Sequence, residues 1–138
     1  MDHARVTLRV TQGSLMGSQF IFEGPSWCVI GRGEDCTIRL PSDQEHAGVS
    51  RHHCLLEITP PEVRLRDLGS LNGTLLNGHK VGQRPASVSP EEAERESART
   101  LELRDGDEVR VGYTVFRVAV TGSVSVEEVS FPMRARGR

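Results

Sequence analysis

The sequence predicts an all-β fold, a sandwich of two sheets that carries its functional residues in loops at one end. Short runs in which apolar and polar residues alternate recur along the 138 residues, and each is typical of a half-buried strand. The 14 glycines and 7 prolines indicate many turns. Most connections are too short for the helices that join parallel strands, so we expect antiparallel pairs. A chain of this length fits one domain.

The first predicted strands all lie before residue 41. Residues 5–10 alternate between valine or leucine and arginine or threonine, so one face is apolar. Residues 19–23 place two phenylalanines on one face. Residues 27–30 form a short apolar run that ends at Gly31-Arg32-Gly33, and residues 36–40 alternate again as far as a proline.

The middle of the chain predicts one hairpin and two tight turns. Residues 53–58 and 62–67 both alternate, and the Pro60-Pro61 pair between them marks the turn of a hairpin. The Asn72-Gly73 and Asn77-Gly78 pairs follow, and each marks a tight turn because asparagine and glycine tolerate a positive φ.

Residues 83–99 differ from the rest of the chain because they are polar and rich in glutamate. The stretch Ser89-Pro90-Glu91-Glu92 within them has the pattern of a helix start, with a hydroxyl cap and proline at the first helical position. One short helix in an exposed loop and an insert without regular structure both fit this composition. The remaining predictions are strands at residues 100–104, 108–111 and 114–120, a domain spanning residues 4–121, and a flexible tail or linker at 122–138.

Composition excludes several classes of protein. The net charge of -2 provides no general basic field for nucleic acid or a membrane surface, and no apolar run is long enough to span a membrane. The three cysteines, Cys28, Cys36 and Cys54, lie in apolar runs without Cys-X-X-Cys spacing. We therefore expect buried thiols in a cytoplasmic protein, with no metal and no cofactor.

Catalytic patterns are incomplete. Ser50, His53 and Asp67 resemble a hydrolase triad in residue type only, since the Gly-X-Ser-X-Gly turn is absent. The glycine-rich Gly31-Arg32-Gly33 leads into a strand, whereas a dinucleotide-binding loop leads into a helix. The histidines and cysteines match no familiar metal spacing, and kinase motifs are absent. We expect no catalysis.

Four polar residues favour an anion site. Arg32 lies between two glycines at a strand end, Ser50 and Arg51 precede another strand, and Asn72 lies in a third loop. Guanidinium groups and a hydroxyl suit phosphate oxygens, and the asparagine amide suits a peptide backbone. Spacing alone leaves open that both arginines are ordinary surface residues and that the Asn-Gly pairs only form turns.

The order of these motifs closely resembles that of the forkhead-associated (FHA) domain family. The resemblance rests on Gly31-Arg32, Ser50-Arg51-His52-His53, Asn72-Gly73-Thr74 and Asn77-Gly78, and on the similarity of residues 103–112 and 114–120 to the closing strands of that family. Each motif is weak alone, but together they cover about residues 4–121 in the family's order. The resemblance implies two twisted antiparallel sheets with about eleven short strands, and loops that bind phosphothreonine in an extended peptide.

The resemblance also implies roles for individual residues. Arg32 and Ser50 would bind the phosphate, Arg51 would flank it, and Asn72 would bind the peptide backbone. Some members have a hydroxyl residue before this asparagine, where the present chain has Leu71. Any phosphate contact there must come from the backbone N–H of Leu71.

Four further positions match family residues that support the loops. They are Gly31, His53, Gly73 and Asn77. The insert at residues 83–99 is longer than expected for the family and would lie near the binding end.

The expected function is a phosphothreonine-dependent module for signalling, whose partner is a phosphorylated protein such as a Ser/Thr kinase or its substrate. Two alternatives remain open: a scaffold or oligomerisation module with an unused phosphate pocket, and the regulatory region of a larger protein such as a Ser/Thr kinase. The presence of both Arg32 and Ser50 favours the first interpretation.

Overall fold

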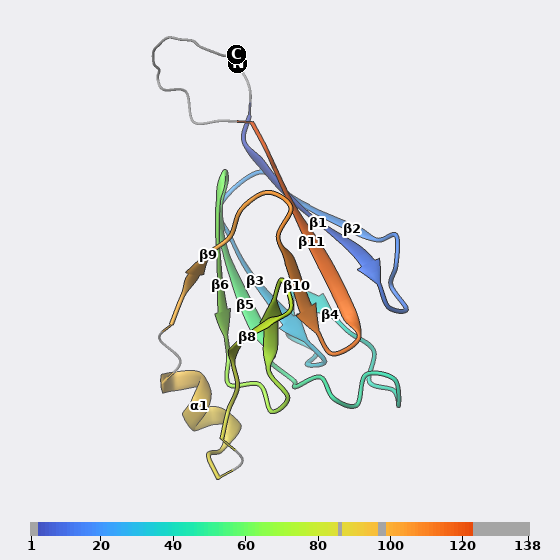
Figure 1. Ribbon diagram of the computed structural model, residues 1–138, viewed down its shortest axis with the longest axis vertical. Helices are drawn as coiled ribbons and strands as arrows, with labels where there is room; N and C mark the ends of the chain where they lie inside the picture. The colour runs from blue at the N-terminus through green and yellow to red at the C-terminus, as the bar shows by residue number, and fades with distance from the viewer. Residues whose placement is uncertain (1–2, 86, 97–98, 123–138) are drawn as a thin grey trace.

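The structure is a computed structural model that describes residues 3–85, 87–96 and 99–122. Its elements are β1 (Arg5–Gln12), β2 (Gln19–Phe22), β3 (Ser26–Gly31), β4 (Ile38–Arg39), β5 (Cys54–Thr59), β6 (Glu62–Asp67), β7 (Thr74–Leu76), β8 (His79–Gly82), α1 (Pro90–Glu96), β9 (Leu101–Glu102), β10 (Glu108–Val111) and β11 (Thr114–Thr121). One sheet has the order β2-β1-β11-β10-β7-β8, and the other has the order β4-β3-β5-β6-β9 (Figure 1). The predicted all-β sandwich is confirmed.

The core lies between the two sheets and is formed by the apolar residues of the alternating strands. Val6, Leu8 and Val10 of β1 are buried as predicted, and Phe116 of β11 is the largest side chain that is fully buried. Burying a side chain of this kind contributes roughly 1.5–3 kcal/mol. Trp27 does not contribute, because it points away from the core and is 69% exposed.

One predicted strand is both shorter than expected and differently paired. Residues 36–40 form only β4, which runs parallel to β3, so the expectation of purely antiparallel pairs is wrong here. Thr37 accounts for the short length, because its hydroxyl donates to the carbonyl of Trp27 and accepts from the N–H of Val29, both at 3.1 Å. Its side chain therefore occupies ladder positions on β3 that a longer antiparallel strand would fill.

The hairpin β7–β8 surrounds the second predicted turn. Asn77 and Gly78 have φ values of 51° and 85°, as expected for a two-residue hairpin turn. Both strands are absent from the predicted set because they are short and because β8 exposes His79 and Lys80 at the sheet edge.

The loops that follow β3 and β6 lie at the opposite end of the sandwich from the start of β1 and the end of β11. The start of β1 pairs with the end of β11, while α1 lies at the other end beside the loops that follow β3 and β6 (Figure 1). The backbone N–H of Glu92 donates to the Ser89 hydroxyl at 3.2 Å, so the helical alternative for the insert is confirmed with its predicted cap. No helix in the described part of the chain has the length and apolar character that a membrane crossing requires.

Candidate functional site

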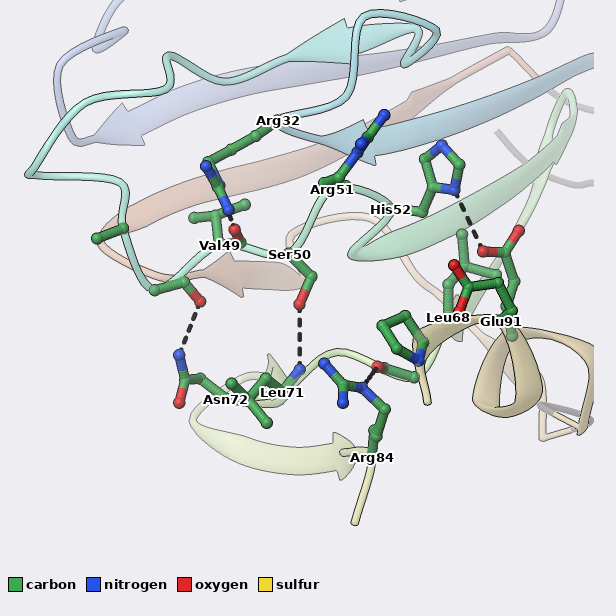
Figure 2. A pocket seen from close by; sticks show the side chains of 15 residues that line it. Arg32, Val49, Ser50, Arg51, His52, Leu68, Leu71, Asn72, Arg84 and Glu91 are labelled. Atoms are coloured by element: carbon green, nitrogen blue, oxygen red, sulfur yellow. Dashed lines mark hydrogen bonds and ion pairs between the residues drawn. The ribbon is translucent and has the colours of Figure 1, made fainter. Parts of the chain in front are cut away.

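A cavity of about 470 Å³ opens at the end of the sandwich that carries α1. Its lining comes from Arg32, from the loop before β5, from the loop between β6 and β7, and from the insert around α1 (Figure 2). The structure thus brings Arg32, Ser50, Arg51, Leu71 and Asn72 together, although they come from three separate loops.

Gly31 and Arg32 are held against the loop before β5. The backbone N–H of Arg32 donates to the Ser50 carbonyl at 3.1 Å, and a Cβ on Gly31 would collide with the Arg51 carbonyl. Only glycine permits such a close approach of the two backbone segments. The Arg32 side chain donates from Nε to the Val49 carbonyl, which orients the guanidinium while its remaining N–H groups stay available to a ligand.

Ser50 connects the two loops that face each other across the cavity. Its hydroxyl oxygen accepts a hydrogen bond of 3.1 Å from the backbone N–H of Leu71, and the pair is visible at the centre of Figure 2. The Leu71 side chain is apolar and exposed, and the backbone N–H of this residue reaches the cavity through its bond to Ser50. Arg51 is also exposed and lines the cavity next to Ser50.

His53 is fully buried beneath the loops and links them. Its Nδ1 accepts from the N–H of Ser50 at 3.1 Å, which leaves the proton on Nε2, where it is donated to the Gly73 carbonyl at 2.9 Å. Burial lowers the pKa of His53 from its usual value, so the ring is neutral and keeps this tautomer at physiological pH.

Asp67 organises the loop between β6 and β7 from within. Its carboxylate accepts from the backbone N–H groups of Gly69 and Ser70 at 2.9 and 3.0 Å. It also accepts from the hydroxyls of Ser70 and Thr74, both at 2.6 Å. In the sequence, Asp67 stood out only as a member of an incomplete triad, whereas in the structure it anchors the loop between β6 and β7.

The two Asn-Gly pairs lie at opposite ends of β7. Asn72 is exposed at the cavity, where its side-chain amide donates to the Gly48 carbonyl at 2.9 Å, and Gly73 follows with a φ of 93°. Asn77 lies away from the cavity and bonds Asp107 and Glu108 at 3.0 and 2.9 Å. Asn77 is therefore the one of the four predicted supporting residues that lies away from the cavity.

The known proteins that this chain is similar to agree on one family. A family model of the FHA domain matches residues 28–112. The chain belongs to the FHA domain family. A solved FHA domain from a structural and functional study of phosphothreonine-dependent interactions is 29% identical, with a TM-score of 0.63 over 86% of this chain and 99% of the other. The FhaA FHA domain, solved in complex with the intracellular domain of Rv3910, is 30% identical, with a TM-score of 0.58 over 82% and 98% of the two chains.

The related full-length proteins are longer than the region they share with this chain. FhaA of Mycobacterium tuberculosis is 33% identical over 109 residues, which is 79% of this chain and 16% of FhaA. FhaB of the same species is 39% identical over 80 residues, which is 57% of this chain and 48% of FhaB. The chain thus spans less than half the length of either relative.

The insert of this FHA domain forms the second wall of the cavity. Arg84, Pro90, Glu91 and Glu94 all line it, so the insert lies near the binding end, as the loop order predicts. Ala93 of α1 packs against Gly69, which fixes the helix beside the loop between β6 and β7. These four lining residues belong to no family motif, so the sequence offered no signal for them beyond the length of the insert.

His52 joins the insert to the loop after β3. Its Nδ1 lies 3.2 Å from Glu94 of α1, and its Nε2 lies 2.9 Å from Asp35. The hydrogen bond to Asp35, and then the one to Glu94, raise the pKa of His52, while the same bond to His52 lowers the pKa of Asp35. The ring therefore gains positive charge between two carboxylates.

One cluster of the described residues has the spacing of metal ligands. Donor atoms of Asp35, Cys36 and His52 lie within 4.8 Å of one another. Protein groups already bind these atoms, since Cys36 Sγ donates to the Arg51 carbonyl at 3.0 Å and His52 bonds two carboxylates. Cys28 and Cys54 are buried as predicted, but Cys36 is only half-buried because it lies in a loop.

Proposed function

We propose that this FHA domain binds phosphothreonine in extended peptides and acts as a recognition module without catalysis. The observation that carries the proposal is the convergence of Arg32, Ser50 and the Leu71 N–H on one cavity of an FHA fold. The phosphothreonine-dependent interactions of a 29% identical FHA domain support the same ligand class.

Each residue of this wall has a role in the proposed complex. The Arg32 guanidinium, oriented by the Val49 carbonyl, donates to phosphate oxygens in a charge-assisted pair. The Ser50 hydroxyl already accepts from Leu71, and its own proton has no acceptor among the described residues, so it is available for a phosphate oxygen. Arg51 adds charge from the exposed rim, and the Asn72 amide binds the peptide backbone.

Dephosphorylation removes most of this interaction. Hydrogen bonds to charged groups contribute roughly 1.5–3 kcal/mol each, so the loss of two weakens binding by about a hundredfold or more. We accordingly propose a phosphorylated protein, such as a Ser/Thr kinase or its substrate, as the partner. The three thiols are compatible with a reducing, cytoplasmic setting, and residues 4–121 are proposed as the complete domain.

Calorimetry with a matched set of peptides tests this function. One peptide is prepared with phosphothreonine, phosphoserine or unmodified threonine, and each form is titrated into the wild type and into Arg32→Ala. The proposal requires micromolar-class binding of the phosphothreonine form to the wild type, weaker binding of the other two, and loss of binding in the variant. Equal affinity for the phosphorylated and unmodified peptides would contradict it.

A further inference from the structure

Arg84 places a third guanidinium on the cavity, on the wall formed by the insert. Its backbone N–H donates to the Ser70 carbonyl at 2.7 Å, so the residue is anchored directly beside Leu71. Its Nε donates to the Gly69 carbonyl at 3.1 Å, and Nη1 donates to the Val88 carbonyl at 2.9 Å. These two side-chain bonds hold the half-buried guanidinium in one orientation.

Arg84 forms no ion pair with any carboxylate whose side chain the structure describes. The two carbonyl bonds use only two of its five N–H donors. A partly buried cation without a carboxylate partner is unfavourable in free energy. Because the guanidinium is already held in one orientation, its conformational entropy falls less when a ligand binds. The group is therefore prepared for an anion from outside the protein.

Arg84 is separated from Arg32 within the cavity. Figure 2 shows the two side chains on opposite sides of the hydrogen bond between Ser50 and Leu71. A phosphate held by Arg32 and Ser50 thus leaves Arg84 free for a different group of the same peptide.

Two acidic residues of α1, Glu91 and Glu94, line the same cavity, but neither forms an ion pair with Arg84. Glu94 instead hydrogen-bonds His52 at 3.2 Å, and Glu91 is exposed to solvent, which screens its charge. Arg84 therefore keeps N–H donors for an anion from outside the protein.

We infer that Arg84 binds a second anionic group of the peptide, a carboxylate or a second phosphate on a residue near the phosphothreonine. This inference rests on the proposed function and specifies its ligand: a peptide that carries two anionic side chains, one for each wall of the cavity. Arg84 is then a residue that determines specificity among phosphothreonine peptides.

A peptide scan against matched variants tests this inference. Phosphothreonine peptides with alanine at all flanking positions are compared with peptides that carry glutamate or phosphoserine at one flanking position at a time. At the preferred position, the wild type should bind the doubly anionic peptide about tenfold more tightly than the alanine peptide. Arg84→Gln should lose this preference and still bind the alanine peptide. A larger gain from phosphoserine than from glutamate identifies the second group as a phosphate.

Two controls keep the result specific. Arg84→Lys retains the charge and should retain part of the preference. Glu102→Gln removes an exposed charge on β9, which does not line the cavity, and should leave the preference intact. Thermal unfolding verifies that all variants fold. The inference is overturned if the wild type shows no preference, if Glu102→Gln abolishes it, or if Arg84→Gln weakens all phosphothreonine peptides by one common factor. If the wild type bound none of the phosphothreonine peptides, the proposed function would be overturned instead.

Discussion

One wall of the cavity is built on the sandwich, and the other is built on the insert. The first wall, with Arg32, Ser50 and Leu71, rests on the buried groups of His53 and Asp67. The second wall, with Arg84 and α1, is held by the carbonyl bonds of Arg84, by a helix cap and by the partly exposed pairs of His52. Buried bonds fix geometry more strongly than exposed ones. The first wall is therefore suited to a constant group, the phosphate, and the second to the variable residues around it.

The largest effect should follow from removing the anchor of the first wall. Asp67→Ala leaves two backbone N–H groups and two hydroxyls without their acceptor, and we expect a loss of about 3–5 kcal/mol in the free energy of unfolding. Urea unfolding measures it, with the exposed Glu102→Gln of β9 as a surface control. A loss below about 1 kcal/mol would show that the loop between β6 and β7 does not depend on this carboxylate.

The next effect concerns ligand affinity at the first wall. Ser50→Ala removes the hydroxyl that faces the cavity and should weaken phosphothreonine peptides by about 10- to 100-fold. Arg51→Ala, which removes an exposed charge, should weaken them by only a fewfold. Calorimetry compares both variants with the wild type. If Arg51→Ala had the larger effect, the phosphate would lie nearer the rim than the proposed site.

A smaller effect is expected at the second wall. Ser89→Ala removes the helix cap and should cost about 0.5–2 kcal/mol, confined to α1 because the insert lies outside the core. Hydrogen exchange should quicken at the amides of α1 and remain unchanged at those of β5. Equal acceleration in both elements would mean that the insert and the sandwich unfold together.

The smallest effect is a dependence on pH at the contact between His52 and α1. Because the pKa of His52 is raised, its bonds to Asp35 and Glu94 contribute fully below its usual value of about 6.5 and are lost as pH rises through the raised value. Because the pKa of Asp35 is lowered, its carboxylate keeps its contribution to this contact until the pH becomes acidic. An NMR titration should place the His52 midpoint above that of a free histidine, and Glu94→Gln should lower it. An unshifted midpoint in the wild type would contradict this.

From the sequence, the residues of the first wall could be predicted better than the local geometry around them could be. Arg32, Ser50 and Asn72 follow family motifs, and the structure brings all three to one cavity. The short length of β4 was not predictable, because the Thr37 side chain bonds the backbone groups of β3 that a longer strand would pair with. The position of Asn77 was not predictable either. An Asn-Gly pair predicts a turn, but it does not predict which loop the turn contacts.

The second wall was predicted only in part. Composition indicated a helix start at Ser89, and the structure confirms it. The function of Arg84 depends on carbonyls of Gly69 and Val88, which only the folded chain brings within reach. Residues in an insert have no motif to mark them, so their contribution becomes visible only through their contacts.

The location of the phosphate is tested most directly by NMR mapping of a phosphothreonine peptide on the isotope-labelled domain. We expect the largest shifts at the guanidinium N–H groups of Arg32 and at the backbone N–H groups of Ser50 and Leu71, and we expect the unphosphorylated peptide to leave these signals in place. Large shifts that cluster elsewhere, for instance around the exposed Trp27, with no change at Arg32 would contradict it.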